Sequence, residues 1–95
     1  MLNSKQRAKL RGMAQHMDAI VHVGKDGITE NIIKQTEEAL EARELIKGSV
    51  QQNAPLSAKE ACNLLAEQTG ADGVSVLGRK FVLYRQSETK KTIEL

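Results

Sequence analysis

The chain has 95 residues, 40% of them hydrophobic, with 14 basic and 12 acidic side chains and a formal net charge of +2. This length suffices for one domain with one core, and it argues against a deep, enclosed active site. The single cysteine excludes an internal disulfide and a cysteine-rich zinc site, and no apolar run approaches the roughly 20 residues of a membrane span. We therefore expect one domain over residues 1–95 of a cytoplasmic protein that needs no membrane and no cofactor.

The charges are unevenly distributed along the chain. Residues 1–17 contain basic side chains and no acidic one, and residues 79–91 contain a single acid, Glu88, among several basic residues. Two basic ends around an acidic middle predict a molecule with one positive face, and an ordinary mixed surface is the alternative. The acidic residues of the middle notably include Glu30, Glu37, Glu38, Glu41 and Glu44.

The first half of the chain predicts a helix, a strand and a second helix. Apolar residues at helical spacing predict a helix over residues 4–17, with Ser4 as its cap. The β-branched run 20–23 predicts a strand, and two glycines then bracket a tight turn over residues 24–27. Thr29 has the position of an N-cap for the second helix.

The second half predicts a strand, a third helix and a hairpin. Residues 45–51 alternate between apolar and polar as in a strand, and Ser57 with Glu60 forms a capping box for the next helix, which Gly70 ends. Two further strands cover residues 74–84, joined by a tight turn at Gly78-Arg79.

The order α-β-α-β-α-β-β predicts an α/β sandwich, with three helices packed on a four-stranded, mixed sheet. The order of the strands within the sheet is not readable from the sequence. Residues after about 86 contain no pattern typical of a helix or strand, and we expect this end of the chain to be frayed.

The segment Gly24-Lys25-Asp26-Gly27 is the first candidate site, because it lies between a predicted strand and the helix start at Thr29. Glycines permit a positive φ and a close approach of the backbone, and the free N–H groups of a helix start attract phosphate. Lys25 adds a mobile cation, and KH domains clamp single-stranded RNA with a Gly-x-x-Gly loop. The spacing does not match a nucleotide-hydrolase P-loop. A plain turn that needs two glycines is the alternative.

Basic side chains form two further candidates. Lys5 and Lys9 fall on one flank of the first helix and Arg11 on the other, where they can follow phosphates, although solubilising surface residues are the alternative. Gly12 weakens this helix, and a closely approaching partner would explain its presence. The third candidate comprises Arg79, Lys80 and Arg85, and it requires that the hairpin lie beside the first helix.

No catalytic or metal-binding arrangement is predicted. His16 and His22 have no other ligand type at a suitable spacing, and Cys62 is interpreted as a packed thiol. The sequence contains no nucleophile elbow and no pair of catalytic acids. We therefore do not expect an enzyme.

Four groups of residues together identify a protein family more specifically than the glycine loop does alone. Between about Leu2 and Arg85 their combination resembles the CRM-domain family (chloroplast RNA splicing and ribosome maturation), in particular its free-standing bacterial members of the YhbY type. The groups are Leu10-Arg11 with Ala14, Val23-Gly24-Lys25 with Gly27-Ile28-Thr29, Glu44-Leu45-Ile46-Lys47, and Gly78 with Leu83-Tyr84-Arg85.

The resemblance implies a compact α/β domain similar to the C-terminal domain of bacterial initiation factor three. It also implies RNA binding through the loop positions Gly24, Lys25 and Gly27 and through an adjacent basic surface that includes Arg11. Free-standing bacterial members of the family associate with precursors of the large ribosomal subunit, and plant relatives act in intron splicing. Asp26 departs from the family, in which Gly or Asn is common, and a carboxylate that faced phosphate would weaken binding.

The sequence thus predicts a monomeric, non-enzymatic RNA-binding protein that acts on ribosomal RNA or large-subunit precursors and assists ribosome assembly. We expect no DNA partner. Because the chain has only two aromatic residues, base stacking contributes little and recognition is mostly of shape. The alternative is a protein-interaction module whose acidic middle docks a basic ribosomal protein.

Overall fold

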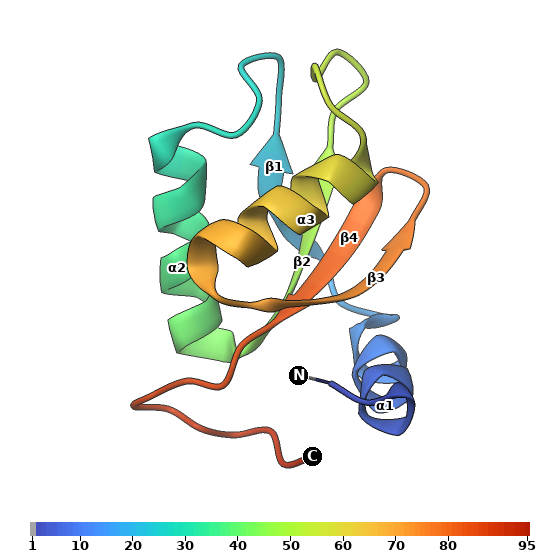
Figure 1. Cartoon of the computed structure of the whole chain (residues 1–95), viewed down its shortest axis with the longest axis vertical. Helices are drawn as coiled ribbons and strands as arrows, with labels where there is room; N and C mark the ends of the chain where they lie inside the picture. The colour runs from blue at the N-terminus through green and yellow to red at the C-terminus, as the bar shows by residue number, and fades with distance from the viewer. Residues whose placement is uncertain (1) are drawn as a thin grey trace.

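The computed structural model describes residues 2–95 as three helices and four strands (Figure 1). The predicted fold class, an α/β sandwich with a mixed four-stranded sheet, is confirmed. The elements are α1 (Ser4–Ala14), β1 (Ala19–Val23), α2 (Glu30–Arg43), β2 (Leu45–Val50), α3 (Ala58–Thr69), β3 (Asp72–Leu77) and β4 (Lys80–Tyr84).

The strands form one sheet in the order β1-β2-β4-β3. β1 is parallel to β2, whereas β4 is antiparallel to both of its neighbours, β2 and β3. β1, β2 and β3 therefore all end at the same edge of the sheet. The three loops that follow these strands, residues 24–29, 51–57 and 78–79, meet at this edge, which we call the loop end.

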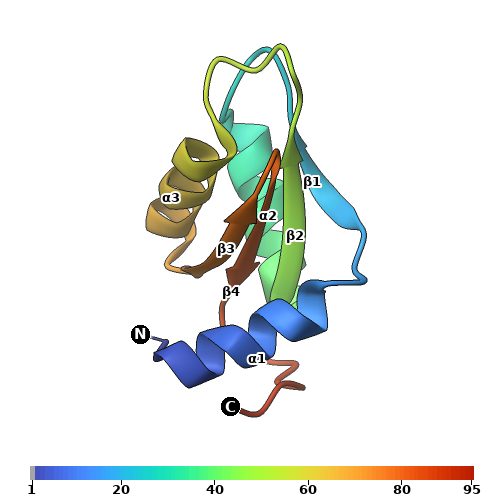
Figure 2. The same cartoon turned by 90° about the vertical axis from the view of Figure 1, so that its right-hand side faces the viewer.

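The two faces of the sheet are covered unequally (Figure 2). α2 and α3 pack on one face and enclose the larger core, in which Phe81 and Leu83 are buried. α1 crosses the other face away from the loop end, where Leu10 and Ala14 pack against a smaller cluster that includes Tyr84. None of the three helices within residues 2–95 covers the rest of this second face, which we call the open face.

Three predicted helix ends are confirmed. The Thr29 hydroxyl accepts a hydrogen bond from the N–H of Ile32 at 3.2 Å, and Ser57 and Glu60 form the reciprocal capping box. Gly70 ends α3 with a left-handed φ of 73°. Short-range hydrogen bonding determines these three ends, so the local sequence suffices to place them.

The ends of α1 differ from the prediction. Asn3, and not Ser4, is the N-cap: its side chain accepts the N–H of Gln6 at 2.8 Å, and the Gln6 side chain accepts the N–H of Asn3 at 3.1 Å. This reciprocal pair satisfies two amides at once. The helix ends at Ala14 instead of Met17, because the Met17 N–H bonds the Ala14 carbonyl at 3.0 Å in a tighter turn that leads toward β1.

Gly48 lies opposite Phe81 in the β2–β4 pair, at the centre of the sheet. A Cβ atom at Gly48 would stand 2.2 Å from Cζ of Phe81, closer than two non-bonded carbon atoms can approach. The missing side chain therefore lets the phenyl ring, which is 1% exposed, lie over the sheet. This contact is long-range, and the alternation of β2 alone shows only that Gly48 belongs to the buried side.

The segment after residue 86 forms no helix or strand, but it is held in place, which corrects the prediction of a frayed end. The carboxylate of Glu44, a fully buried residue, accepts the backbone N–H groups of Ser87 at 2.7 Å, Thr92 at 2.7 Å and Ile93 at 2.9 Å. Burial raises the pKa of the Glu44 carboxyl, and these three N–H donors outweigh burial and hold the pKa below its usual value. Charge-assisted bonds of this kind fix the segment.

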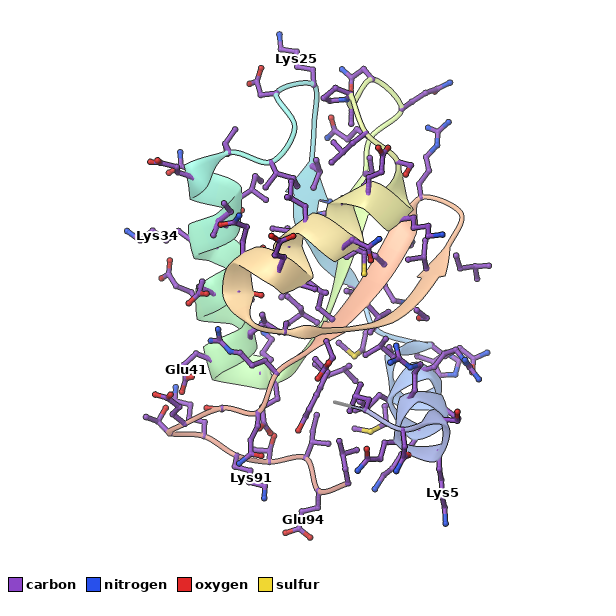
Figure 3. All side chains as sticks on the ribbon, in the orientation of Figure 1. Lys5, Lys25, Lys34, Glu41, Lys91 and Glu94 are labelled. Carbon is purple, nitrogen blue, oxygen red and sulfur yellow. The ribbon has the colours of Figure 1, made fainter. Side chains whose placement is uncertain are left out.

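A second carboxylate, that of Glu41 in α2, holds the same segment. Glu41 accepts the hydroxyl groups of Ser87 and Thr89, each at 2.7 Å. These hydroxyl donors lower the pKa of the Glu41 carboxyl from 4.5 to about 2. Figure 3 shows Glu41 beside this segment, at the opposite end of the molecule from Lys25.

The contact at Gly48 predicts opposite effects for two glycine substitutions. Gly48→Ala should lower the free energy of unfolding by about 1–3 kcal/mol, because the added methyl group overpacks the core against Phe81. Gly12→Ala is the matched control, since a Cβ there meets no atom within 4 Å, and it should raise the free energy of unfolding by up to about 1 kcal/mol. Urea denaturation measures both. A Gly48→Ala variant as stable as the wild type would contradict this account.

The lowered pKa of Glu41 predicts that the protein loses stability in acid. Because the pKa of Glu41 lies at about 2 in the folded chain and near 4.5 otherwise, its contribution is complete above about pH 4.5 and disappears as the pH falls toward 2. Glu41→Gln should therefore flatten the fall of unfolding free energy over this range. Glu38→Gln, at an exposed residue of the same helix, is the control. Identical pH profiles of Glu41→Gln and wild type would refute the assignment.

Candidate nucleic-acid interface

The glycine loop is a tight turn between β1 and α2. The N–H of Gly27 bonds the carbonyl of Gly24 at 3.0 Å, so Lys25 and Asp26 occupy the two central positions and both side chains are exposed. Gly27 has a φ of 71°, and a Cβ atom there would stand 3.3 Å from Cγ of Pro55. The turn itself therefore requires Gly27, and the presence of a ligand is not needed to explain it.

Two features beside the loop, a hollow and the free amides of a helix start, could bind an anion. A shallow hollow of about 450 Å³ lies between residues 24–27, the start of α2 and the loop after β2, with Thr29 and Gln51 among its lining residues. The Thr29 hydroxyl accepts a hydrogen bond from the N–H of Ile32. The two N–H groups before it in the first turn of α2 have no partner within the helix. Lys25 extends from the tip of the turn into solvent (Figure 3).

Two carboxylates near the glycine loop disfavour the binding of an anion there. Asp26 is exposed within the turn, and Glu30 is exposed in the first turn of α2. Glu30 interacts favourably with the positive end of the helix dipole and so competes with phosphate for it. The cationic character of the loop therefore depends on Lys25.

The β3–β4 hairpin places two more predicted cations at the loop end. Its two-residue turn has Gly78 first, with a φ of 61°, as predicted for a tight hairpin. Arg79 follows, and its carbonyl accepts the N–H of Val50 at 2.8 Å, which fixes the turn beside the end of β2. Arg79 and Lys80 are both exposed.

The cations of α1 do not lie beside the glycine loop. Lys5 and Lys25 are at opposite ends of the longest axis of the molecule, which extends over 36 Å (Figures 1 and 3). Lys9 donates from Nζ to the carbonyl of Glu94 at 2.7 Å, so part of its hydrogen-bonding capacity is used within the chain. The structure therefore does not join these two lysines and the loop into one compact patch.

Arg11 is the α1 cation that approaches the rest of the basic surface. It lines a hollow of about 710 Å³ between α1 and the open face of the sheet, together with Lys47 and Lys80. We call this hollow, between residues 8–15 and strands β2, β4 and β3, the α1 groove. Residues of α1 and of the β3–β4 hairpin line it together, so the hairpin lies beside the first helix, as the third candidate site requires.

Lys47 is the cation that sequence reasoning missed as a site residue. The alternation of β2 already places it on the face opposite Ile46 and Gly48, but no local pattern groups it with the other cations. Its proximity to Lys80 depends on the β2–β4 register, which the sequence does not reveal.

Arg85 is separated from Arg79 and Lys80, with which the sequence grouped it. Its Nη1 atom lies 3.3 Å from the Glu37 carboxylate and donates to the Thr69 carbonyl at 2.8 Å, and Nη2 lies 3.9 Å from the Glu41 carboxylate. The side chain is only 23% exposed. Arg85 thus ties the end of β4 to α2 and α3, away from the loop end.

His22 and Cys62, two residue types that can serve in catalysis or metal binding, have ordinary structural surroundings here. His22 pairs with Ser49 on the open face, with 2.9 Å between Nδ1 and Oγ. Cys62 is buried, and burial raises the pKa of its thiol, which disfavours the nucleophilic thiolate. Within residues 2–95 no three His, Cys, Asp or Glu side chains gather around a possible metal position.

In the same range, no helix has the length and apolar character needed to cross a bilayer.

The chain is similar to proteins that are named for RNA binding. The Probable RNA-binding protein YqeI of Bacillus subtilis is 44% identical over 95 residues, which cover 100% of this chain and 99% of that protein. An RNA-binding protein of Haemophilus influenzae is 36% identical over 90 residues, which cover 95% of this chain and 91% of the relative.

A solved structure and a family model agree with these similarities. The solution structure of SAV1595 from Staphylococcus aureus matches with a TM-score of 0.84 and 46% identity, over 100% of this chain and 99% of that protein. Residues 2–85 match the model of the CRS1 / YhbY (CRM) domain, a range that contains the glycine loop, the α1 groove and the hairpin. The chain belongs to the CRS1 / YhbY (CRM) domain family.

Proposed function

We propose that this protein binds ribosomal RNA within precursors of the large ribosomal subunit and assists their assembly, as a monomer in the cytoplasm and without catalysis. Relatives that match nearly the whole chain are named as RNA-binding proteins, which supports RNA as the ligand. The ribosomal target is the one that the family resemblance implies.

The observation that carries this proposal is the set of exposed cations at the loop end. Lys25 stands at the tip of the turn, and Arg79 and Lys80 lie across β2 from it in the hairpin. The two ion pairs within residues 2–95 both involve Arg85, so these three cations remain free for phosphate. Lys25 and the amides of the adjacent helix start would hold one phosphate group, and the hairpin would hold another.

Recognition should depend on the RNA backbone more than on the bases. Phe81 and Tyr84, the two aromatic residues of the chain, are 1% and 7% exposed, so neither forms a platform for base stacking. Contacts of lysine and arginine with phosphates carry no sequence information by themselves. We therefore expect this protein to select its RNA mainly by shape.

The alternative, an acidic surface that docks a basic ribosomal protein, is less well supported. Glu44 is buried and Glu41 binds the C-terminal segment, while Glu37 pairs with Arg85. Three acids of the predicted acidic middle thus make their main contacts within the chain. The hollow beside α2 that Glu37 and Glu41 line is also lined by Arg85 and Lys90.

RNA affinity should depend strongly on salt. If four or five phosphates are contacted, the logarithm of the association constant should fall against the logarithm of salt concentration with a slope of about −3 to −4.5. Filter binding to ribosomal RNA at several salt concentrations measures this slope. The docking alternative expects no RNA affinity even at low salt, and crosslinking in cells would show whether large-subunit precursors are the RNA bound.

Two substitutions in the glycine loop should change RNA affinity in opposite directions. Lys25→Ala removes a phosphate contact, so it should weaken binding to all RNAs and reduce the steepness of the salt dependence by about one unit. Asp26→Lys should strengthen binding, because a carboxylate near phosphate becomes a cation. Both residues are exposed, so the free energy of unfolding should change by no more than about 0.5 kcal/mol.

Lys34→Ala is the matched control for Lys25→Ala. Lys34 is an exposed lysine that projects sideways from α2, apart from Lys25 at the tip of the glycine loop (Figure 3), and its removal should leave RNA affinity unchanged. Equal affinities of the wild type and both loop variants would exclude the glycine loop as the contact. The α1 groove would then have to supply the RNA contacts.

A further inference from the structure

The α1 groove combines three cations with no acid. Arg11 comes from α1, Lys47 from the central strand β2 and Lys80 from β4, and the twelve lining residues include no Asp or Glu. Neither of the two ion pairs within residues 2–95 involves any of them. Like charges placed together without a counter-charge repel one another, so an anion bound among them would be stabilised.

The sheet holds two of these cations in a defined geometry. Lys47 pairs with Val82 in the β2–β4 ladder, and Lys80 lies two residues before Val82 on the same face. Such diagonal neighbours have Cβ atoms roughly 7–8 Å apart. Lys47 is half-buried on the central strand. Its ammonium group is therefore more restricted than that of Lys25 at the tip of a turn.

The floor and rim of the groove are apolar. Val74 and Val82 are buried beneath it, and Val76 and Leu77 are 41% and 85% exposed along the β3 side. Leu77 is the most exposed of the large hydrophobic residues in the described chain. A surface that offers an apolar floor beside cations matches a ligand with one flat apolar part and one anionic part.

Gly12 leaves the helical side of the groove open. It lines the groove, and a Cβ atom added to it would meet no other atom within 4 Å. Unlike Gly48, it is therefore not required by internal packing. A glycine in the middle of a helix weakens that helix, and its benefit here would be the space that it leaves for a ligand.

We propose that the α1 groove is a second RNA contact that takes one unpaired nucleotide. The base would lie on the apolar floor, and the adjoining phosphate would lie among Arg11, Lys47 and Lys80. Its volume, about 710 Å³, is within the range of pockets that hold small ligands. This inference rests on the proposed RNA-binding function and adds a preference for RNA that contains unpaired nucleotides, which the glycine loop alone does not provide.

An introduced tryptophan tests the groove directly, because the chain has none of its own. Leu77→Trp places an indole at the groove, and Leu64→Trp places one on α3, which packs on the other face of the sheet and leaves Leu64 38% exposed. Single-stranded oligouridylate should quench the fluorescence of the Leu77→Trp variant and not that of Leu64→Trp. A blunt-ended RNA duplex should quench the Leu77→Trp variant at least several-fold less.

Two further changes separate the groove from the glycine loop. Lys47→Ala, made in the Leu77→Trp background, should weaken oligouridylate binding several-fold, whereas Lys25→Ala should weaken oligouridylate and duplex binding alike. Gly12→Leu should fill the groove and also weaken oligouridylate binding, while Gly12→Ala should leave it nearly unchanged. Equal free energies of unfolding of the two Gly12 variants, measured in urea, would show that a loss confined to Gly12→Leu does not arise from unfolding.

The outcomes distinguish this inference from the proposed function. If filter binding detects RNA but the Leu77→Trp fluorescence and the Lys47→Ala affinity stay unchanged, the groove is not an RNA contact and the proposed function stands. If neither oligouridylate nor duplex nor ribosomal RNA binds, both are wrong. If polyglutamate quenches the Leu77→Trp variant at lower concentration than oligouridylate does, the groove is a site for acidic protein segments and the inference is overturned.

Discussion

The contact between Gly48 and Phe81 is the constraint on which the arrangement of this surface depends. The phenyl ring fits over the central strands only because β2 has no side chain at that position. It sets the β2–β4 register, and the alternation of the two strands then directs Lys47 and Lys80 to the open face. A shift of β4 by one residue against β2 would turn Lys80 to the face that α2 and α3 cover and so separate it from Lys47. A core contact therefore determines where the cations lie.

The acidic and basic residues of the chain have different roles in the fold. Glu41 and Glu44 bind the C-terminal segment through hydroxyl and N–H donors, and Glu37 pairs with Arg85. Glu44 does so with a φ of 66°, an uncommon conformation for a residue with a side chain, and its buried hydrogen bonds offset that cost. Glu37, Glu41 and Glu44 thus make their main contacts inside the protein. The cations at the loop end and in the α1 groove have no such partners, which explains how a chain with a small net charge presents a basic surface.

The candidate interface was partly predictable from the sequence. The turn at Gly24–Gly27 and the cap at Thr29 follow from short-range hydrogen bonds, and Lys25 is exposed because it occupies a central turn position. Charge alone predicts Lys5 and Arg85 as parts of the interface, but Lys5 lies at the far end of the molecule and Arg85 forms ion pairs within it. Charge along a sequence does not determine whether a cation meets phosphate or a carboxylate of its own chain.

The sequence by itself determined the element order, three of the helix ends and the glycine turns, because capping and alternation act over only a few residues. Only the tertiary structure decided the strand order, the position of α1 on one part of the open face, and the proximity of Arg11, Lys47 and Lys80. It also decided that the C-terminal segment is held, since the Glu44 carboxylate that binds it is more than forty residues away in the chain. These features depend on contacts between distant residues, and their energies come from burial and strand register, which no local pattern encodes.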